Sequence, residues 1–212
     1  GLYDFYMNDM TVLALSGTPW WFPNPGHGTP PSARGGHAAV YDPVRHRMLV
    51  IGGFGQALLN DVWEYAPPGV GTWQPVTVSG TPMPARAQHA AVYDPGRDRV
   101  IVIGGEGGTF RNDVWALNLS GSPSWQALTP TGTPPSGRRQ HTAIHEPVGD
   151  RVIVYGGFDG VRRGDTWELR LGDPPAWSRL YSSTVSPASR FGHTAVYDAP
   201  RRRMVMFGGD LG

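Results

Sequence analysis

Short apolar runs separated by turn-forming residues recur along this chain, and they predict β-strands. Within the stretch 37–88 the runs are residues 37–42, 47–51, 61–65 and 72–78. The first run ends at Asp-Pro and the second at Gly52-Gly53, both of which favour turns. The last run contains Pro75, which favours an edge strand. Since no segment keeps an apolar period of about 3.6 residues, we expect an all-β chain with almost no helix.

This pattern of strands and turns repeats with a period of 52 residues. HAAVYDP at 37–43 returns at 89–95, then as HTAIHEP at 141–147 and as HTAVYDA at 193–199. Other columns with the same period are the glycine pairs at 52, 104, 156 and 208 and the tryptophans Trp63, Trp115 and Trp167. A second tryptophan series comprises Trp21, Trp73, Trp125 and Trp177. A regular internal period indicates an array of one structural unit.

Four short strands per unit, joined by turns, are typical of one blade of a β-propeller. A glycine pair after the second strand, an aromatic residue about ten positions on and a tryptophan about ten further resemble the signature of kelch repeats. The resemblance covers the whole chain and implies a propeller of four-stranded kelch blades. It implies little about function, because propellers carry many unrelated activities. We expect the tryptophans of the first series to be largely buried.

We expect residues 1–212 to form a single propeller domain of four blades. The whole repeats are 37–88, 89–140 and 141–192, and a composite blade would combine 1–36 with 193–212. The N-terminal segment supplies two outer strands and the C-terminal segment two inner ones. Two architectures fit this division: a closed four-bladed ring, or half of a larger ring that a second copy or further sequence completes.

The composition excludes several classes of site. The formal net charge of +1 favours neither nucleic acid nor an acidic membrane. The absence of cysteine excludes disulfides, thiolate metal sites, cysteine nucleophiles and the Tyr–Cys crosslink of the copper oxidases that resemble kelch propellers. Without a run of 18 apolar residues we expect no membrane-spanning segment, and we expect no signal peptide; the cellular compartment is left open.

The loops between the second and third strands are residues 2–7, 54–59, 106–111 and 158–163, and they vary while the strands barely change. Variable loops on a constant frame are where binding specificity usually lies. Their large side chains, which could form an exposed contact patch, are Phe5, Tyr6, Met7, Leu58, Leu59 and Phe110. Alternatively, each one covers its own blade.

A second set of candidates is arginine. Arg34, Arg86, Arg138 and Arg190 each stand three positions before a repeated histidine. Resemblance to kelch adaptors that capture acidic peptides implies arginines lining a central pocket at this position. A framework role is the alternative, in which these arginines pair with the repeated Asp9, Asp61, Asp113 and Asp165. The arginines that do not recur in every unit, and so fit specificity better, are Arg139, Arg162 and Arg163.

The repeated histidines His37, His89, His141 and His193 could ring an axis as metal ligands, but we expect them to bond neighbouring blades. The repeated acids before Pro or Ala-Pro, which we expect to form turns on the opposite face, are Asp42, Asp94, Glu146 and Asp198. No serine–histidine–acid set, phosphate-cradling loop or close carboxylate pair stands out. We therefore expect no catalytic residue, no metal and no cofactor.

These observations favour a non-catalytic scaffold that binds a protein, peptide or glycan through the face built by the strand 2–3 and strand 4–1 loops. We expect no nucleic-acid or membrane partner. A homodimer that completes a larger ring is one form of the assembly. The alternatives are an enzyme that uses the axial pocket and an assembly-forming domain of a larger protein.

Overall fold

The computed structural model describes residues 6–24, 26–66, 71–182 and 186–211, and it contains three four-stranded antiparallel sheets. The first blade comprises β3 (Ala38–Asp42), β4 (Arg47–Phe54), β5 (Leu58–Ala66) and β6 (Thr72–Pro75). The second comprises β7 (Ala90–Asp94), β8 (Arg99–Glu106), β9 (Phe110–Asn118) and β10 (Ser124–Leu128). The third comprises β11 (Thr142–Glu146), β12 (Arg151–Tyr155), β13 (Thr166–Arg170) and β14 (Ala176–Leu180). The all-β, four-stranded prediction is confirmed, although β6 ends at Pro75 rather than at residue 78.

Two half-blades flank the three whole ones. The N-terminal half-blade pairs β1 (Thr11–Ala14) with β2 (Trp20–Pro23). The C-terminal half-blade pairs β15 (Thr194–Asp198) with β16 (Arg203–Phe207) around the short 3₁₀ turn η1 (Ala199–Arg201). None of the described helical residues forms a segment long and apolar enough to cross a membrane.

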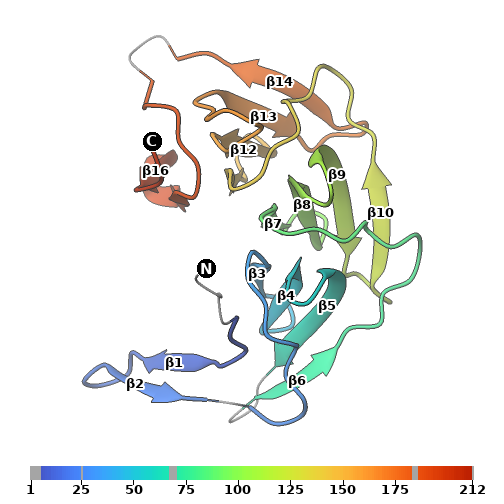
Figure 1. Ribbon diagram of the computed structural model, residues 1–212, viewed down its shortest axis with the longest axis vertical. Helices are drawn as coiled ribbons and strands as arrows, with labels where there is room; N and C mark the ends of the chain where they lie inside the picture. The colour runs from blue at the N-terminus through green and yellow to red at the C-terminus, as the bar shows by residue number, and fades with distance from the viewer. Residues whose placement is uncertain (1–5, 25, 67–70, 183–185, 212) are drawn as a thin grey trace.

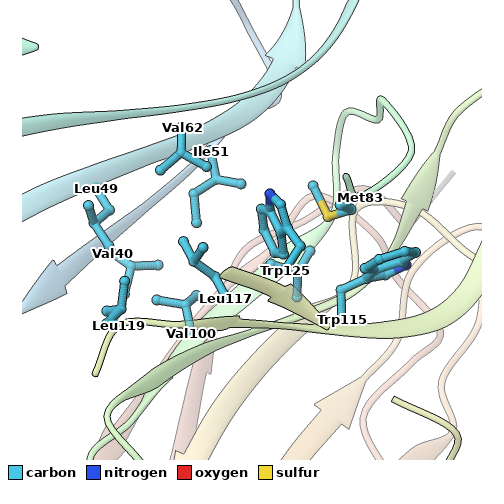
Figure 2. Close-up of a cluster of buried hydrophobic side chains, with 11 residues drawn as sticks. Val40, Leu49, Ile51, Val62, Met83, Val100, Trp115, Leu117, Leu119 and Trp125 are labelled. Carbon is cyan, nitrogen blue, oxygen red and sulfur yellow. The ribbon is translucent and has the colours of Figure 1, made fainter. Parts of the chain in front are cut away.

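The core lies between consecutive blades, and the second blade buries both of its faces. Figure 2 shows the first of these seams, where Val40, Leu49 and Ile51 of the first blade meet Val100 and Leu117 of the second. A matching cluster joins the other face of the second blade to the third. Strands buried on both faces read as continuous apolar runs, as the β8 sequence RVIVIGGE does.

The two tryptophan series differ in burial. Trp115 of the first series is buried, while Trp63 and Trp167 are partly exposed. The second series is buried more uniformly in the whole blades, at Trp73, Trp125 and Trp177. The outermost strand therefore holds its tryptophan inside the seam between blades.

On the face formed by the hairpin turns, which we call the turn face, a belt of ion pairs links neighbouring blades. Asp42 shapes its turn as predicted, since Oδ1 accepts hydrogen bonds from the amides of Val44 and Arg45, both at 3.1 Å. The Arg45 guanidinium then crosses to Asp98 of the second blade, with Nη2–Oδ2 at 2.7 Å. Arg97 repeats this contact one blade later, to Asp150 at 2.7 Å.

The blades follow one another around an open arc, with the half-blades at its two ends (Figure 1). β1–β2 and β15–β16 are separate two-stranded sheets, so the described chain does not close on itself as a four-bladed ring. The composite blade built from 1–36 and 193–212 remains a prediction.

Candidate functional site

Two loop sets meet on the face opposite the turn face, which we call the loop face. The residues before each inner strand form single β-bridges to the ends of the second strands and the loops that follow them: Gly35 to Phe54, Ala87 to Glu106, Arg139 to Phe158 and Phe191 to Asp210. Each bridge repeats one 52-residue column, yet the side chains in those columns differ. The sequence therefore keeps the backbone of this face constant and varies its chemistry.

A hollow of about 460 Å³ opens on the loop face between the first and second blades. It is lined by Tyr6, Gly35, Gly36, Phe54, Leu58, Ala87, Gln88, Glu106 and Gly108. The rings of Tyr6 and Phe54 meet edge to face with centroids 5.9 Å apart and form an aromatic wall. The hollow combines this aromatic wall with the polar side chains of Gln88 and Glu106, which could orient a ligand.

Beside this hollow, three aromatic rings and two arginines pack against one another in a row, which we call the Phe–Arg row. It consists of Phe110, Arg139, Phe158, Phe191 and Arg162. The Arg139 guanidinium lies 5.6 Å from the Phe110 ring and 5.5 Å from the Phe158 ring, and it pairs with Glu106. Phe158 in turn meets Phe191 edge to face at 5.4 Å. Ring–cation contacts of this kind fix a long side chain in one pose.

The charge on this face is mostly positive. Arg163 pairs with Asp159 at 2.7 Å and Arg162 with Asp210 at 3.4 Å. Arg111 and Arg190, by contrast, have no carboxylate partner among the described residues; Arg111 bonds the Gly107 carbonyl at 3.1 Å. Unneutralised guanidinium groups favour acidic groups on a partner.

Of the repeated arginines, Arg34, Arg86 and Arg138 are buried and paired. Arg138 binds Asp165 through both nitrogens, at 2.6 and 2.9 Å, and also bonds the Gly156 carbonyl at 2.9 Å. Burial alone would raise the pKa of Asp165, but hydrogen bonds from Arg138 and Trp167 outweigh it and lower that pKa to about 2. The framework alternative is thus confirmed for these three arginines, and a direct ligand contact by them remains a prediction only.

Each of these arginines joins two consecutive blades. The Arg86 backbone bonds Leu59 and Gly53 of the first blade, while its side chain bonds Gly104 and Asp113 of the second. Arg190 repeats the backbone bonds and the carbonyl contact, with its Nη1 on the Gly208 carbonyl at 2.9 Å. The predicted partner column begins with Asp9, which is exposed in the N-terminal half-blade.

The remaining predicted residues divide between the hollow and its rim. Tyr6 and Leu58 line the hollow, and Leu59 lines a neighbouring depression with Tyr6. Phe110 belongs to the Phe–Arg row. Arg162 and Arg163 border a third, polar depression at the edge of the third blade. Phe5 lies outside the described residues.

The repeated histidines pack between blades, close to the glycine pairs. A Cβ built on Gly105 would lie 2.8 Å from Cβ of His89, and one on Gly104 would lie 3.0 Å from Cε1 of His141. Burial, then the charge of Arg86, lowers the pKa of His89 to about 3, so the ring is neutral. His193 forms the expected inter-blade hydrogen bond, with Thr142 Oγ1···His193 Nε2 at 2.8 Å. For His89 the expectation is wrong, because neither of its buried ring nitrogens has a hydrogen-bond partner among the described residues. The glycine pairs therefore make room for one histidine from each of two blades.

On the turn face, Asp94, His145 and Asp150 bring possible metal-ligand atoms within 4.8 Å of one another. Both carboxylates are already paired there: Arg97 binds both, and Arg99 binds Asp94 at 2.9 Å. Two guanidinium groups balance the two carboxylates, so this trio has no excess negative charge for a cation.

Comparison with known proteins agrees with this geometry. The KLHDC2/KLHL20/DRC7 Kelch-repeats domain matches residues 3–209. The chain belongs to the kelch-repeat family. Its kelch blades superpose on the structure of YjhT with a TM-score of 0.70 at 17% identity, covering 91% of this chain and 64% of that one.

Kelch relatives of this chain occur within much larger proteins. It is 32% identical to the dynein alpha chain of the flagellar outer arm of Chlamydomonas reinhardtii, over 91% of this chain and 4% of that protein. It is 31% identical to the leucine-zipper-like transcriptional regulator 1 homolog of Drosophila melanogaster, over 86% and 19%. For human host cell factor 2 the identity is 29%, over 87% and 25%. The chain thus spans a quarter or less of these relatives.

Several residues of the kelch loop face were not singled out by the sequence prediction, although four of them lie in the variable loops 54–59, 106–111 and 158–163. They are Phe54, Gln88, Glu106, Arg111, Phe158 and Phe191. Each occupies a 52-residue column whose residue type changes from unit to unit. Column-by-column variability next to the glycine pairs was therefore the signal that would have found them.

Proposed function

We propose that this kelch domain is a non-catalytic scaffold that binds a protein partner through its loop face. The Phe–Arg row carries the proposal, because it places Arg139 between two aromatic rings at the edge of a hollow of about 460 Å³. Arginine and aromatic side chains dominate the binding energy of protein interfaces. Kelch relatives embedded in large proteins support an interaction role for the domain.

The partner's chemistry follows from the charges on this face. Arg111 forms no ion pair with a described carboxylate, and Arg162 makes only a long contact to Asp210. The proposed ligand is therefore an extended peptide segment with acidic side chains beside an apolar one. A glycan would use the same aromatic rings without the need for acidic groups.

An enzyme using the same hollow is less well supported. Tyr6 and Glu106 are the titratable groups among its lining residues, and Glu106 is paired with Arg139. This gives the hollow no adjacent pair of nucleophile and base.

Peptide selection tests the proposal. A random peptide library is displayed against the immobilised chain, and the recovered peptides are titrated onto the wild type, Arg139→Ala and Phe158→Ala. We expect acidic peptides, with binding weakened at least about tenfold by either change, since interface hot spots contribute 2 kcal/mol or more. Val44→Ser on the turn face is the matched control and leaves binding unchanged. Peptides that bind all four proteins equally would place the site elsewhere.

A further inference from the structure

Two glutamines on the loop face have a backbone conformation that glycine adopts without strain. They belong to the column two positions after each inter-blade arginine, where φ is 62° at Gly36, 56° at Gln88, 54° at Gln140 and 66° at Gly192. Positive φ destabilises a residue that has a Cβ, whereas glycine adopts it freely. Gln88 and Gln140 are therefore strained at positions where two other units have glycine.

The backbone of this column makes the same hydrogen bonds with either residue type. Gln88 N–H donates to the Gly36 carbonyl at 2.6 Å, and Gln140 N–H donates to the Gln88 carbonyl at 2.9 Å. Gly192 N–H continues the series to the Gln140 carbonyl, also at 2.9 Å. Since Gly192 makes this bond without a side chain, the glutamine side chains are not required for the contact between blades.

The other strained side chains of the described chain all have a partner. They form one column on the turn face, and their contacts are His46 with Tyr41, Asp98 with Arg45, Asp150 with Arg97 and Arg202 with Glu146. The carboxamides of Gln88 and Gln140 have no such contact among the described residues. Backbone strain that no internal contact explains is a feature of functional sites.

The position of Gln88 connects this strain with the hollow. Gln88 is one of the residues that line the hollow, and its Oε1 is buried without a hydrogen-bond partner among the described residues. A Cβ built on Gly36 would lie 3.0 Å from Cγ of Gln88, so glycine in the preceding unit leaves room for the glutamine. Gln140 directly follows Arg139 of the Phe–Arg row. The two carboxamides thus belong to the two parts of the proposed binding face.

We propose that Gln88 and Gln140 bind the main chain of the peptide ligand, an inference that rests on the proposed function. The free Oε1 of Gln88 needs a donor. An ionised acidic side chain has only acceptors, whereas the peptide group has both an N–H donor and a carbonyl acceptor. A carboxamide is complementary to such a group, so the glutamines would hold the backbone while Arg139 and the aromatic rings select side chains.

Glycine substitution separates binding from folding. The peptides recovered by library selection are titrated onto the wild type, Gln88→Gly and Gln140→Gly. We expect each variant to bind about three- to tenfold more weakly, the range for loss of one neutral hydrogen bond. The unfolding midpoint should stay the same or rise, because glycine relieves the strain. His46→Gly makes the same change at a strained position of the turn face and should leave peptide binding unchanged.

Ester substitution in the ligand tests the main-chain contact directly. Each ester replaces one backbone N–H of the peptide by oxygen and keeps its side chains. We expect one ester position to weaken binding to the wild type about three- to tenfold. The same ester should have no further effect on Gln88→Gly, because the partner of that N–H is already absent.

Three results would overturn this inference while leaving the proposed function in place. They are glycine variants that bind the peptides like the wild type, glycine variants with a lowered unfolding midpoint, and ester effects that are equal in the wild type and Gln88→Gly. Failure of the selection to recover any peptide would instead overturn the proposed function, and this inference with it.

Discussion

Arg86 and Asp113 form a bidentate ion pair at the seam between the first and second blades, with Nη1–Oδ1 at 2.6 Å and Nη2–Oδ2 at 2.7 Å. Arg86 is fully buried, and Asp113 also accepts a hydrogen bond from Trp115 Nε1 at 2.8 Å. The same set recurs at Arg34 with Asp61 and at Arg138 with Asp165. These pairs are thus the polar counterpart of the apolar seams.

Arg86→Ala should therefore destabilise the fold. The change leaves Asp113 and the Gly104 carbonyl without their shared partner, and loss of one member of a buried pair costs about 3–5 kcal/mol. We expect a loss near the lower end of this range of destabilisation, because Asp113 is partly exposed. Urea unfolding followed by tryptophan fluorescence measures this change. The matched control is Arg111→Ala, which removes an unpaired guanidinium and should cost less than about 1 kcal/mol.

Trp177→Ala should lower the free energy of unfolding by about 3–5 kcal/mol, because it empties a large volume in the seam between the second and third blades. Tyr181→Ala, in the same part of the chain, removes an exposed ring and should change stability by no more than about 1 kcal/mol. Thermal unfolding of both variants compares them. Equal losses would contradict the burial assigned to the second tryptophan series.

Gly105→Ala should lower the free energy of unfolding more than Gly108→Ala does. Both glycines have positive φ, 96° and 84°, so both substitutions cost about 1–2 kcal/mol in backbone strain. The new Cβ at Gly105 would also lie 2.8 Å from the Ala87 carbonyl oxygen and from His89, whereas Gly108 has open space. Crowding adds about 1–3 kcal/mol. Equal effects of the two changes on the unfolding midpoint would show that the histidine contact is unimportant.

Stability should fall as the pH is lowered from about 6.5 toward 3. The pKa of His89 is lowered from 6.5 to about 3 by burial, and His141 behaves alike. Between these values the unfolded chain binds protons that the folded chain does not. Each histidine therefore lowers the free energy of unfolding by about 1.4 kcal/mol for each pH unit of acidification. Urea titrations at pH 7, 6 and 5 measure the slope. His89→Gln should make it shallower, and an unchanged slope would mean that His89 is protonated in the folded state.

The repeat pattern was sufficient to predict the blades, because a 52-residue period aligns strands, turns and glycine pairs without any knowledge of packing. The same alignment predicted that Arg138 and Asp165 would pair, since both recur at fixed positions in the unit. The relative burial of the two tryptophan series could not be predicted. That depends on which strand lies deepest in the seam, and neighbouring blades decide it.

The binding face was predicted only in part. Arg139 and Phe110 were identified as candidates because they break the repeat, but their contact through the ring face depends on the meeting of loops from two blades. Phe158 lies in the variable loop 158–163 without differing from Phe54 of the first unit, and Phe191 lies outside the four variable loops. The curvature of the arc could not be predicted from the sequence. It is the sum of the small tilts between neighbouring blades, and single side chains such as Ala38 or Thr142 do not determine those tilts.

The backbone of each inter-blade arginine is hydrogen-bonded to one unit, and its side chain donates hydrogen bonds to the next unit. A duplicated 52-residue gene segment would therefore encode a new unit together with both halves of its own attachment. Unequal recombination at any point of the period would keep every attachment intact, with no compensating substitution in the flanking units. The number of units in such an array could thus change during evolution without disturbing the contacts between neighbouring units. The closure of the two ends of the array would be the remaining constraint.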